Sequence, residues 1–423
     1  MPQDVSKPVL TIAVVGAGPV GLALALHAAQ QLPEAHITLF DARPAERDVA
    51  GDPRTLALSL GSVQLLQRLG VWPERMAQPI LQVHVSQAPP TLDWGTVESA
   101  VHIRASEEKV PMLGAVLSYG QVVAPMQAAW LALAASQPRR LATRFGTSVS
   151  AIKPLEHGVE VDAGVVEAFD LAVIAEGGVF AEQDRKSVTR DYAQAAWVGT
   201  VTLTDTTPGL AVERFTRNGP LALLPLRDDA DQPADGPARA ALVWCVPVAD
   251  DPVADLTDAQ RLTVLRHSLP DVAGQLVGIG PLKRFALGLN AERTLVDGAT
   301  VRIGNAAQTL HPVAGQGMNL GLRDAFELVQ ALRREFGPGR STQPPGDANA
   351  LARPPSMSAA LRRVEWSRAP DRWAMIAATD FLARSFTWRW PGLPAARGLA
   401  LALLQAVPPL KSALARQMMF GRR

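Results

Sequence analysis

The chain has 423 residues, of which 48% are hydrophobic and 19% are charged, a composition typical of a folded protein with a large core. Its 41 basic and 40 acidic residues leave a net charge of +1, so nucleic acid is not expected as a partner. The length favours two domains.

The N-terminal residues carry a nucleotide-binding pattern. They lack the features of a signal peptide, so a cytoplasmic protein is expected. An apolar strand pattern over 9–15 leads to Gly16, Gly18 and Gly21, spaced as GxGxxG, and then to a helical pattern. A second strand pattern ends at Asp41, about 20 residues after the last glycine. These features are those of a βαβ unit that binds a dinucleotide, and they do not distinguish FAD from NAD.

Three further candidates follow along the chain. Arg54 lies in a polar loop before a helix predicted over 59–69, where it is either a ligand of the cofactor or a solvated surface charge. Gln121 lies near the start of another helix, which extends through 135. Glu176 ends a buried strand and is followed by two glycines, as is common where open α/β sheets bind ligands.

The pattern changes between about 194 and 289, where short strands alternate with turns. Strands are predicted over 195–203, 211–215, 221–226 and 240–248, and a helix over 258–269 begins with a capping box of Thr257 and Gln260. Cys245, the single cysteine, is expected to be a buried thiol in a reducing compartment. A mainly β domain is thus inserted into the first domain. The predicted pieces are 1–80, 105–185 and 291–340 for the nucleotide-binding domain, 81–104 and 186–290 for the second domain, and 341–423 for a linker and C-terminal helices.

A third glycine-rich stretch follows a strand pattern over 300–303. It contains a turn at Gly304 and Asn305, and a helix that begins beside Gly315 and Gly317. Taken alone, this is also the pattern of an ordinary turn. Free N–H groups and the helix dipole there favour negative charge, such as that of a reduced flavin. FAD is long enough to use all three glycine-rich strand ends, so FAD is the predicted cofactor, bound by Gly16, Gly18, Gly21, Asp41, Arg54, Gln121, Glu176, Asn305, Gly315, Gln316, Gly317, Met318 and Asn319.

The C-terminal residues are unusually basic. A stretch rich in Pro, Gly and Ser over 337–356 predicts a linker, and the helical residues 381–423 contain seven basic and no acidic side chains. Trp388, Trp390 and a Leu/Ala run lie among them, a combination that suits an anionic membrane surface. The alternative is a helix packed on the core with its arginines facing water. No window of about 18 residues is apolar enough to span a bilayer.

The motifs together resemble those of the flavoprotein aromatic hydroxylases, and within them the ubiquinone-biosynthesis group. The resemblance rests on GAGPVG at 16–21, DPRTLALS at 52–59 and GNAAQTLHPVAGQGMNLGLRD at 304–324, and it extends over nearly the whole chain. It implies an α/β fold of the aromatic-hydroxylase type: a Rossmann-like FAD-binding domain, an inserted mainly β substrate domain and a helical C-terminal tail. One departure concerns the hydride donor, because Glu176 is followed by two glycines where the family has Asp-Gly.

The resemblance also implies an activity. NAD(P)H would reduce FAD, O₂ would add at the flavin C4a atom, and the hydroperoxide would hydroxylate the ring of a polyprenylated phenol. His311 and Pro312 would line the flavin face, with His311 as a positioning residue. No metal is expected, because the seven histidines lack ligand spacing. The protein would be peripheral at the inner face of the cytoplasmic membrane and part of a ubiquinone-biosynthesis complex. The alternatives are a hydroxylase of soluble aromatic compounds, a saturating reductase, and an FAD-binding scaffold without turnover.

Overall fold

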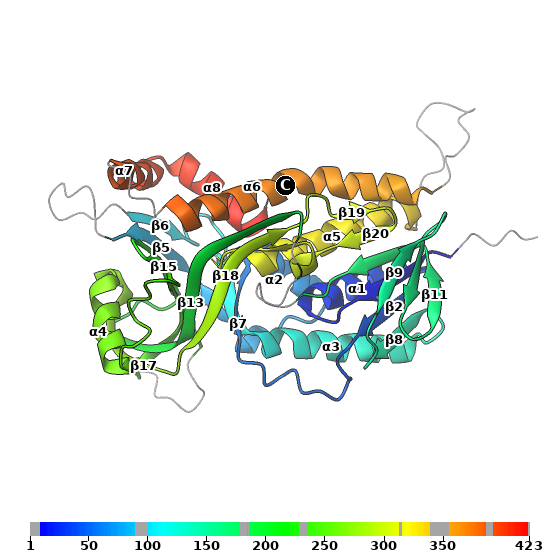
Figure 1. Ribbon diagram of the computed structural model, residues 1–423, viewed down its shortest axis with the longest axis horizontal. Helices are drawn as coiled ribbons and strands as arrows, with labels where there is room; N and C mark the ends of the chain where they lie inside the picture. The colour runs from blue at the N-terminus through cyan, green and yellow to red at the C-terminus, as the bar shows by residue number, and fades with distance from the viewer. Residues whose placement is uncertain are drawn as a thin grey trace, which may run out of the picture.

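The structure is a computed structural model that describes residues 9–88, 100–177, 184, 186–227, 236–312, 315–338, 355–385 and 392–421. Most of the predicted linker, together with Trp388 and Trp390, lies outside these residues. Two large sheets lie at opposite ends of the molecule, and the C-terminal helices extend along one side of both (Figure 1). The molecule therefore has the predicted combination of an α/β domain, a mainly β domain and a helical tail.

The first large sheet is the Rossmann-like sheet that the N-terminal pattern predicts. Its strand order is β19-β20-β12-β1-β2-β8, and all neighbours are parallel except β19 and β20. The strands are β1 (Thr11–Val15), β2 (His36–Asp41), β8 (Leu141–Phe145), β12 (Leu171–Ile174), β19 (Val296–Asp297) and β20 (Thr300–Arg302). The helices α1 (Pro19–Gln31), α3 (Tyr119–Ser136) and α5 (Gln316–Phe336) pack beside it.

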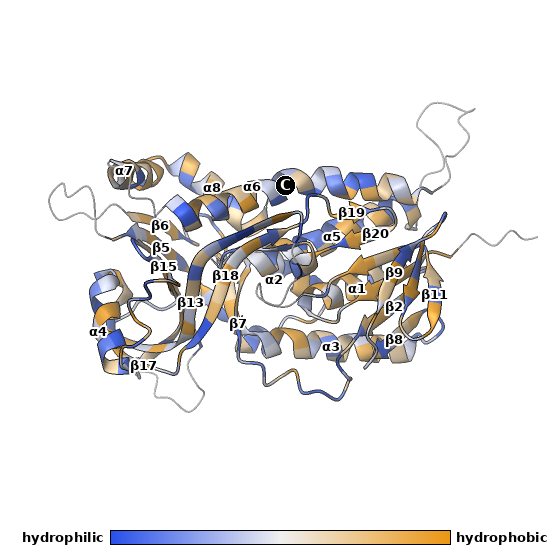
Figure 2. Cartoon of the chain, in the orientation of Figure 1, coloured by the Kyte–Doolittle hydropathy of each residue, from blue (hydrophilic) through white to orange (hydrophobic). Residues whose placement is uncertain are grey.

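Burial explains the composition of α1, which contacts both α3 and α5. Every residue from Pro19 to Ala29 is buried, and Figure 2 shows the helix mostly in hydrophobic colours. A helix enclosed by a sheet and two helices has no polar face, in contrast to a surface helix. The turn before α1 is therefore held on a rigid element.

The second large sheet is mainly antiparallel, with the order β21-β18-β13-β16-β15-β14-β5-β6 and with β17 also paired to β13. Its strands are β5 (Gln82–Gln87), β6 (Ala100–Arg104), β13 (Val188–Thr204), β14 (Leu210–Thr216), β15 (Gly219–Pro225), β16 (Ala238–Pro247), β17 (Gln275–Ile279), β18 (Lys283–Ala291) and β21 (Gln308–Thr309). The four strands predicted here are confirmed, as is the capping box of α4 (Asp258–Ser268). Cys245 is buried as predicted, and burial raises the pKa of its thiol.

The remaining elements connect or cover these sheets. Two small sheets contain β3 (Thr55–Ser59), β4 (Gln78–Ile80) and β7 (Gly114–Ser118), and β9 (Ala151–Pro154), β10 (Val159–Asp162) and β11 (Val166–Phe169). The helix α2 (Leu60–Arg68) follows β3, and the C-terminal helices are α6 (Met357–Ser385), α7 (Leu393–Ala406) and α8 (Pro408–Phe420). Within the described part of the chain no single helix is long and apolar enough to cross a membrane, although α7 and α8, bent by 96°, meet those criteria together.

Candidate functional site

Three strand ends with glycines meet at one edge of the first sheet. The strands β1, β12 and β20 are parallel neighbours, so the residues that follow them lie side by side. A Cβ atom on Gly16 would lie 2.8 Å from the backbone nitrogen of Glu176, and one on Gly177 would overlap Asn305. The three glycine-rich stretches therefore converge, as an extended cofactor requires.

The N-terminus of α1 provides free backbone donors. Gly18 is its N-cap, no side chain caps the helix, and the first turn contains no acidic residue. Gly16 adopts a φ of +105°, which favours glycine. Among the residues that the structure describes, a Cβ atom on Gly18 would have only the Tyr119 hydroxyl within 4 Å, at 3.6 Å, so a ligand has room to approach. This arrangement suits a pyrophosphate.

Asp41 lies at the end of β2, where a ribose-binding acid is expected. Its Oδ2 accepts a hydrogen bond of 2.5 Å from the backbone N–H of Ala17, and its Oδ1 accepts one of 2.9 Å from Arg43 Nε. Burial alone would raise the pKa of Asp41, but the hydrogen bonds from Arg43 and Ala17 outweigh burial and lower it. The residue is thus a charged acceptor beside the glycine turn.

Arg54 lies on the ring of Tyr119, with its guanidinium carbon 4.2 Å from the ring centroid. The same guanidinium pairs with Asp52, at 2.8 Å between Arg54 Nη2 and Asp52 Oδ2. Burial raises the pKa of the Tyr119 hydroxyl, which therefore stays protonated near Gly18. Arg54 is consequently anchored near the glycine turn before α1 instead of being a fully solvated charge.

The N-terminus of α5 offers the second open approach. Gly315 is its N-cap with a φ of +59°, and no side chain caps the helix. A Cβ atom on Gly317 would meet no atom of the described chain within 4 Å. Gln316 Oε1 accepts a hydrogen bond of 3.3 Å from Arg323, and Met318 packs against the main core. Open space beside an uncapped helix start fits the electron-rich edge of a flavin ring.

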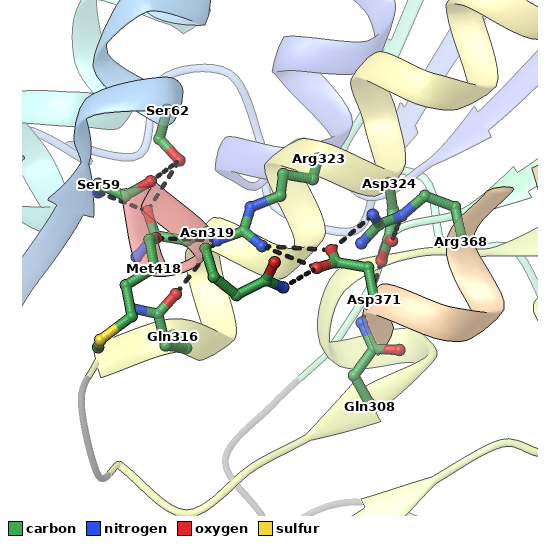
Figure 3. Close-up of polar contacts among 11 residues, drawn as sticks. Ser59, Ser62, Gln308, Gln316, Asn319, Arg323, Asp324, Arg368, Asp371 and Met418 are labelled. Carbon is green, nitrogen blue, oxygen red and sulfur yellow. Dashed lines mark hydrogen bonds and ion pairs between the residues drawn. The ribbon is translucent and has the colours of Figure 1, made fainter. Parts of the chain in front are cut away.

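Two of the predicted cofactor ligands use their side chains within the protein. Asn319 accepts hydrogen bonds of 2.8 Å from Ser59 N and Ser62 Oγ (Figure 3). It donates to the carbonyls of Ala57 and Gly315. These four bonds use the full capacity of its amide, so only its backbone remains for a cofactor. Gln121 Oε1 accepts from Ser118 N in a capping box that begins α3. Both side chains thus hold the elements that carry the site.

His311 has an orienting partner that sequence reasoning missed. Its Nε2 lies 3.0 Å from Gln194 Oε1, and its ring makes an edge contact with Tyr192, with 5.3 Å between the ring centroids. A bulge in β13 between Asp191 and Gln194 redirects these side chains. Burial lowers the pKa of His311 to about 4, so the ring is neutral at pH 7. Pro312 lies in the turn before α5, where its carbonyl accepts from Gly315 N at 3.0 Å.

Sequence reasoning also missed Arg43 and Tyr119 at the nucleotide end of the site. A signal existed for Arg43, which is two residues after Asp41 and binds it directly. Tyr119 carries no motif of its own, and only the folded chain brings it to Gly18 and Arg54. Neither Tyr192 nor Gln194 shows a pattern beyond that of a strand.

Acid is expected to destabilise the protein through buried imidazoles. Burial lowers the pKa of His27, His84 and His311 to about 4 each. Because the unfolded pKa is 6.5, each ring contributes stability above that pH and loses it as the pH falls towards 4, by about 3 kcal/mol in each case. Urea unfolding between pH 7.5 and 5 should therefore show a steep loss of unfolding free energy. His84→Leu should reduce this slope, whereas the same change at the exposed His157 serves as control; equal slopes would contradict the assignment.

Comparison with known proteins agrees with this geometry. A family model described as FAD binding domain matches residues 189–339. The 3-demethoxyubiquinol 3-hydroxylase of Escherichia coli is 28% identical over 411 residues, which cover 95% of this chain and 96% of that protein. The ubiquinone hydroxylase UbiL of Rhodospirillum rubrum is 28% identical over 421 residues, which cover 97% of this chain and 90% of that protein.

The fold also matches solved structures. Klebsiella pneumoniae HpxO in complex with FAD and uric acid superposes with a TM-score of 0.63 at 16% identity, over 96% of this chain and 97% of that one. Identity this low shows only a shared fold. Taken with the sequence relatives, it means that the chain is an FAD-dependent aromatic monooxygenase with the aromatic-hydroxylase fold, similar along nearly its whole length to hydroxylases of ubiquinone biosynthesis.

Proposed function

We propose that this protein hydroxylates the aromatic ring of a polyprenylated phenol, with O₂ as the second substrate and NAD(P)H as the hydride donor. The names of the two relatives support a quinol or quinone precursor as the substrate class. The observation that carries the proposal is the apolar face of the second sheet beside His311.

That face follows from strand geometry. Gln194 bonds His311, and side chains two residues apart on β13 share its face. The β16 residues that pair with this face of β13 are also apolar. The resulting cluster contains Ala196, Val198, Val243, Cys245, Leu287 and Tyr192. A ring with a hydrocarbon chain needs such a lining, with few polar groups to set its orientation.

Glu213 is the acidic group on this face. Glu213 pairs with Ala222 on β15, and Ala222 pairs in turn with Val243 on β16. Because directly paired residues point to the same side of a sheet, Glu213 shares the face of Val243. Its carboxylate lies close enough to Cys245 to add to the effect of burial in raising the pKa of that thiol. We assign to Glu213 the hydrogen bond to the hydroxyl of the substrate.

FAD, once reduced by a hydride from NAD(P)H, would supply the electrons that activate O₂, and the chain would supply position and electrostatics. The backbone N–H groups at the start of α5 stabilise negative charge at the adjacent ring edge. His311 is neutral and only 1% exposed, so it orients groups and helps to exclude water, and it does not act as a charged acid. Gln194 keeps its ring in one orientation.

The purified protein is expected to show the two absorption bands of oxidised flavin. With NADH or NADPH, O₂ and a short-chain prenylated phenol, it should form a product that contains oxygen from isotopically labelled O₂, detected by mass spectrometry. The same phenol without its prenyl chain is the matched control, and it should turn over more slowly because it makes fewer apolar contacts with this face.

Other outcomes would identify another function. Faster turnover of the phenol without the chain would favour a hydroxylase of soluble aromatic compounds. Bound flavin with no turnover of either phenol would favour a scaffold. A colourless protein that cannot be reconstituted with FAD would contradict the cofactor site itself.

A further inference from the structure

The helices α7 and α8 expose a set of apolar side chains to solvent. Between 395 and 414, every exposed residue is apolar. Leu399 is 63% exposed, Leu403 55% and Leu410 49%. We call this surface the outer stripe; it consists of Ala395, Ala396, Leu399, Ala400, Leu403, Ala406, Val407, Pro408, Pro409, Leu410, Ala413 and Leu414.

Between 395 and 414, the polar side chains of these helices face the protein. Lys411 is 7% exposed and its Nζ lies 2.9 Å from Glu107 Oε2, while Ser412 Oγ donates to Glu108 at 2.6 Å. Gln405 Oε1 accepts a hydrogen bond of 2.9 Å from the backbone N–H of His102 on the edge strand β6. A helix on the surface of a soluble protein has the opposite arrangement. These inward contacts hold the outer stripe in its exposed orientation.

The outer stripe therefore needs an apolar partner. The helices α6, α7 and α8 lie along one side of the molecule (Figure 1), and Figure 2 shows hydrophobic colours on α7. Residues 381–423 carry seven basic and no acidic side chains, and Arg416, directly after the stripe, has a side chain 72% exposed. The basic side chains outnumber their acidic partners Glu107, Glu108 and Asp380, so an anionic surface fits this region better than a second copy of it does.

We propose that the outer stripe lies in the headgroup and upper acyl layer of an anionic lipid bilayer. The two helices have 14 and 13 residues, so each is roughly 20 Å long, shorter than the hydrocarbon core of about 30 Å. With a bend of 96° between them, they rest in the interface without crossing it. The bilayer dissolves the prenyl chain of the substrate, and in this respect the inference rests on the proposed function.

The test compares two pairs of substitutions with the same change of charge. Leu399→Glu with Leu403→Glu places two carboxylates in the outer stripe. The control is Val165→Glu with Val166→Glu, at 67% and 54% exposure on the β10–β11 hairpin at the far end of the molecule. Each protein, with FAD bound, is sedimented with vesicles of phosphatidylcholine that contain about one-third phosphatidylglycerol, and with phosphatidylcholine vesicles alone.

The wild type and the control should bind the anionic vesicles, and the Leu399/Leu403 variant should bind at least about ten-fold more weakly. Wild type that stays in the supernatant would overturn the proposal, as would equal loss in both variants. So would self-association of the wild type, seen by sedimentation velocity and abolished in the Leu399/Leu403 variant. No substrate is present, so these results are independent of the hydroxylation assay.

Discussion

A Gly21→Ala protein is expected to fold less stably and to be purified with at least about ten-fold less FAD than the wild type. A Cβ atom at this position would overlap the carbonyl oxygen of Gly16 and approach Ala175 Cβ to 3.2 Å. Gly16 cannot easily move away, because its N–H donates 2.8 Å to the Phe40 carbonyl of the neighbouring strand. The turn that presents Gly18 must therefore shift. We expect a loss of about 3 kcal/mol, measured by urea unfolding, with flavin absorbance per protein as the second readout.

Gly317→Ala separates cofactor binding from folding. Its Cβ atom would meet no atom of the described residues within 4 Å, and alanine in a helix is favoured over glycine by about 1 kcal/mol. The apoprotein should thus be as stable as the wild type or slightly more stable, while FAD binds more weakly because the methyl group occupies space beside the ring. Unchanged FAD affinity in Gly317→Ala would show that the flavin does not approach α5. Unchanged FAD content in Gly21→Ala would contradict the assignment of the nucleotide site to the turn before α1.

The parts of the site that local patterns encode were predictable. A glycine between a strand and a helix signals a close turn wherever it lies, so the three strand ends were found from their neighbours in sequence alone. The capping box of Thr257 and Gln260 is local in the same sense, since its partners are three residues apart. The parallel order of β1, β12 and β20 then follows from the general rule for such folds.

Contacts between distant residues were not predictable. His311 and Gln194 are 117 positions apart, and a bulge that no motif marks brings them together. The tail is a similar case, because composition identified its basic and apolar residues but did not indicate which of them face the protein. Composition places Lys411 among the basic residues of the tail, yet it is buried against Glu107, while Leu399 and Leu403 face outward.

A buried ion network joins the C-terminal helices α6 and α8 to α5, and sequence reasoning missed it as well. Asp371 on α6 is fully buried (Figure 3). It accepts a hydrogen bond of 2.8 Å from Arg368 Nη1 and one of 3.2 Å from Arg323 Nη1 on α5. It also accepts 2.9 Å from Gln417 Nε2 on α8. In sequence, Arg368 and Asp371 resemble a solvated pair three residues apart on a helix, and only tertiary packing removes them from water.

Asp371→Asn should therefore be strongly destabilising. It keeps the shape of the side chain but leaves Arg368 and Arg323 with less negative charge in a buried site, which costs about 3–5 kcal/mol. The control is Asp380→Asn on the same helix, whose ion pairs with Arg190 and Arg384 are partly exposed and contribute about 1 kcal/mol or less. Urea unfolding measures both changes.

The network predicts a further consequence for Asp371→Asn. Arg323 also donates hydrogen bonds to Gln316 at the start of α5 and to the Met418 carbonyl on α8. Loss of the Asp371 charge should therefore loosen the start of α5 and the end of α8. Limited proteolysis should cut α8 sooner than in the wild type, and FAD should dissociate faster. Asp380→Asn should change neither. If Asp371→Asn matches Asp380→Asn in urea unfolding, in proteolysis and in FAD dissociation, the network does not couple the C-terminal helices to α5.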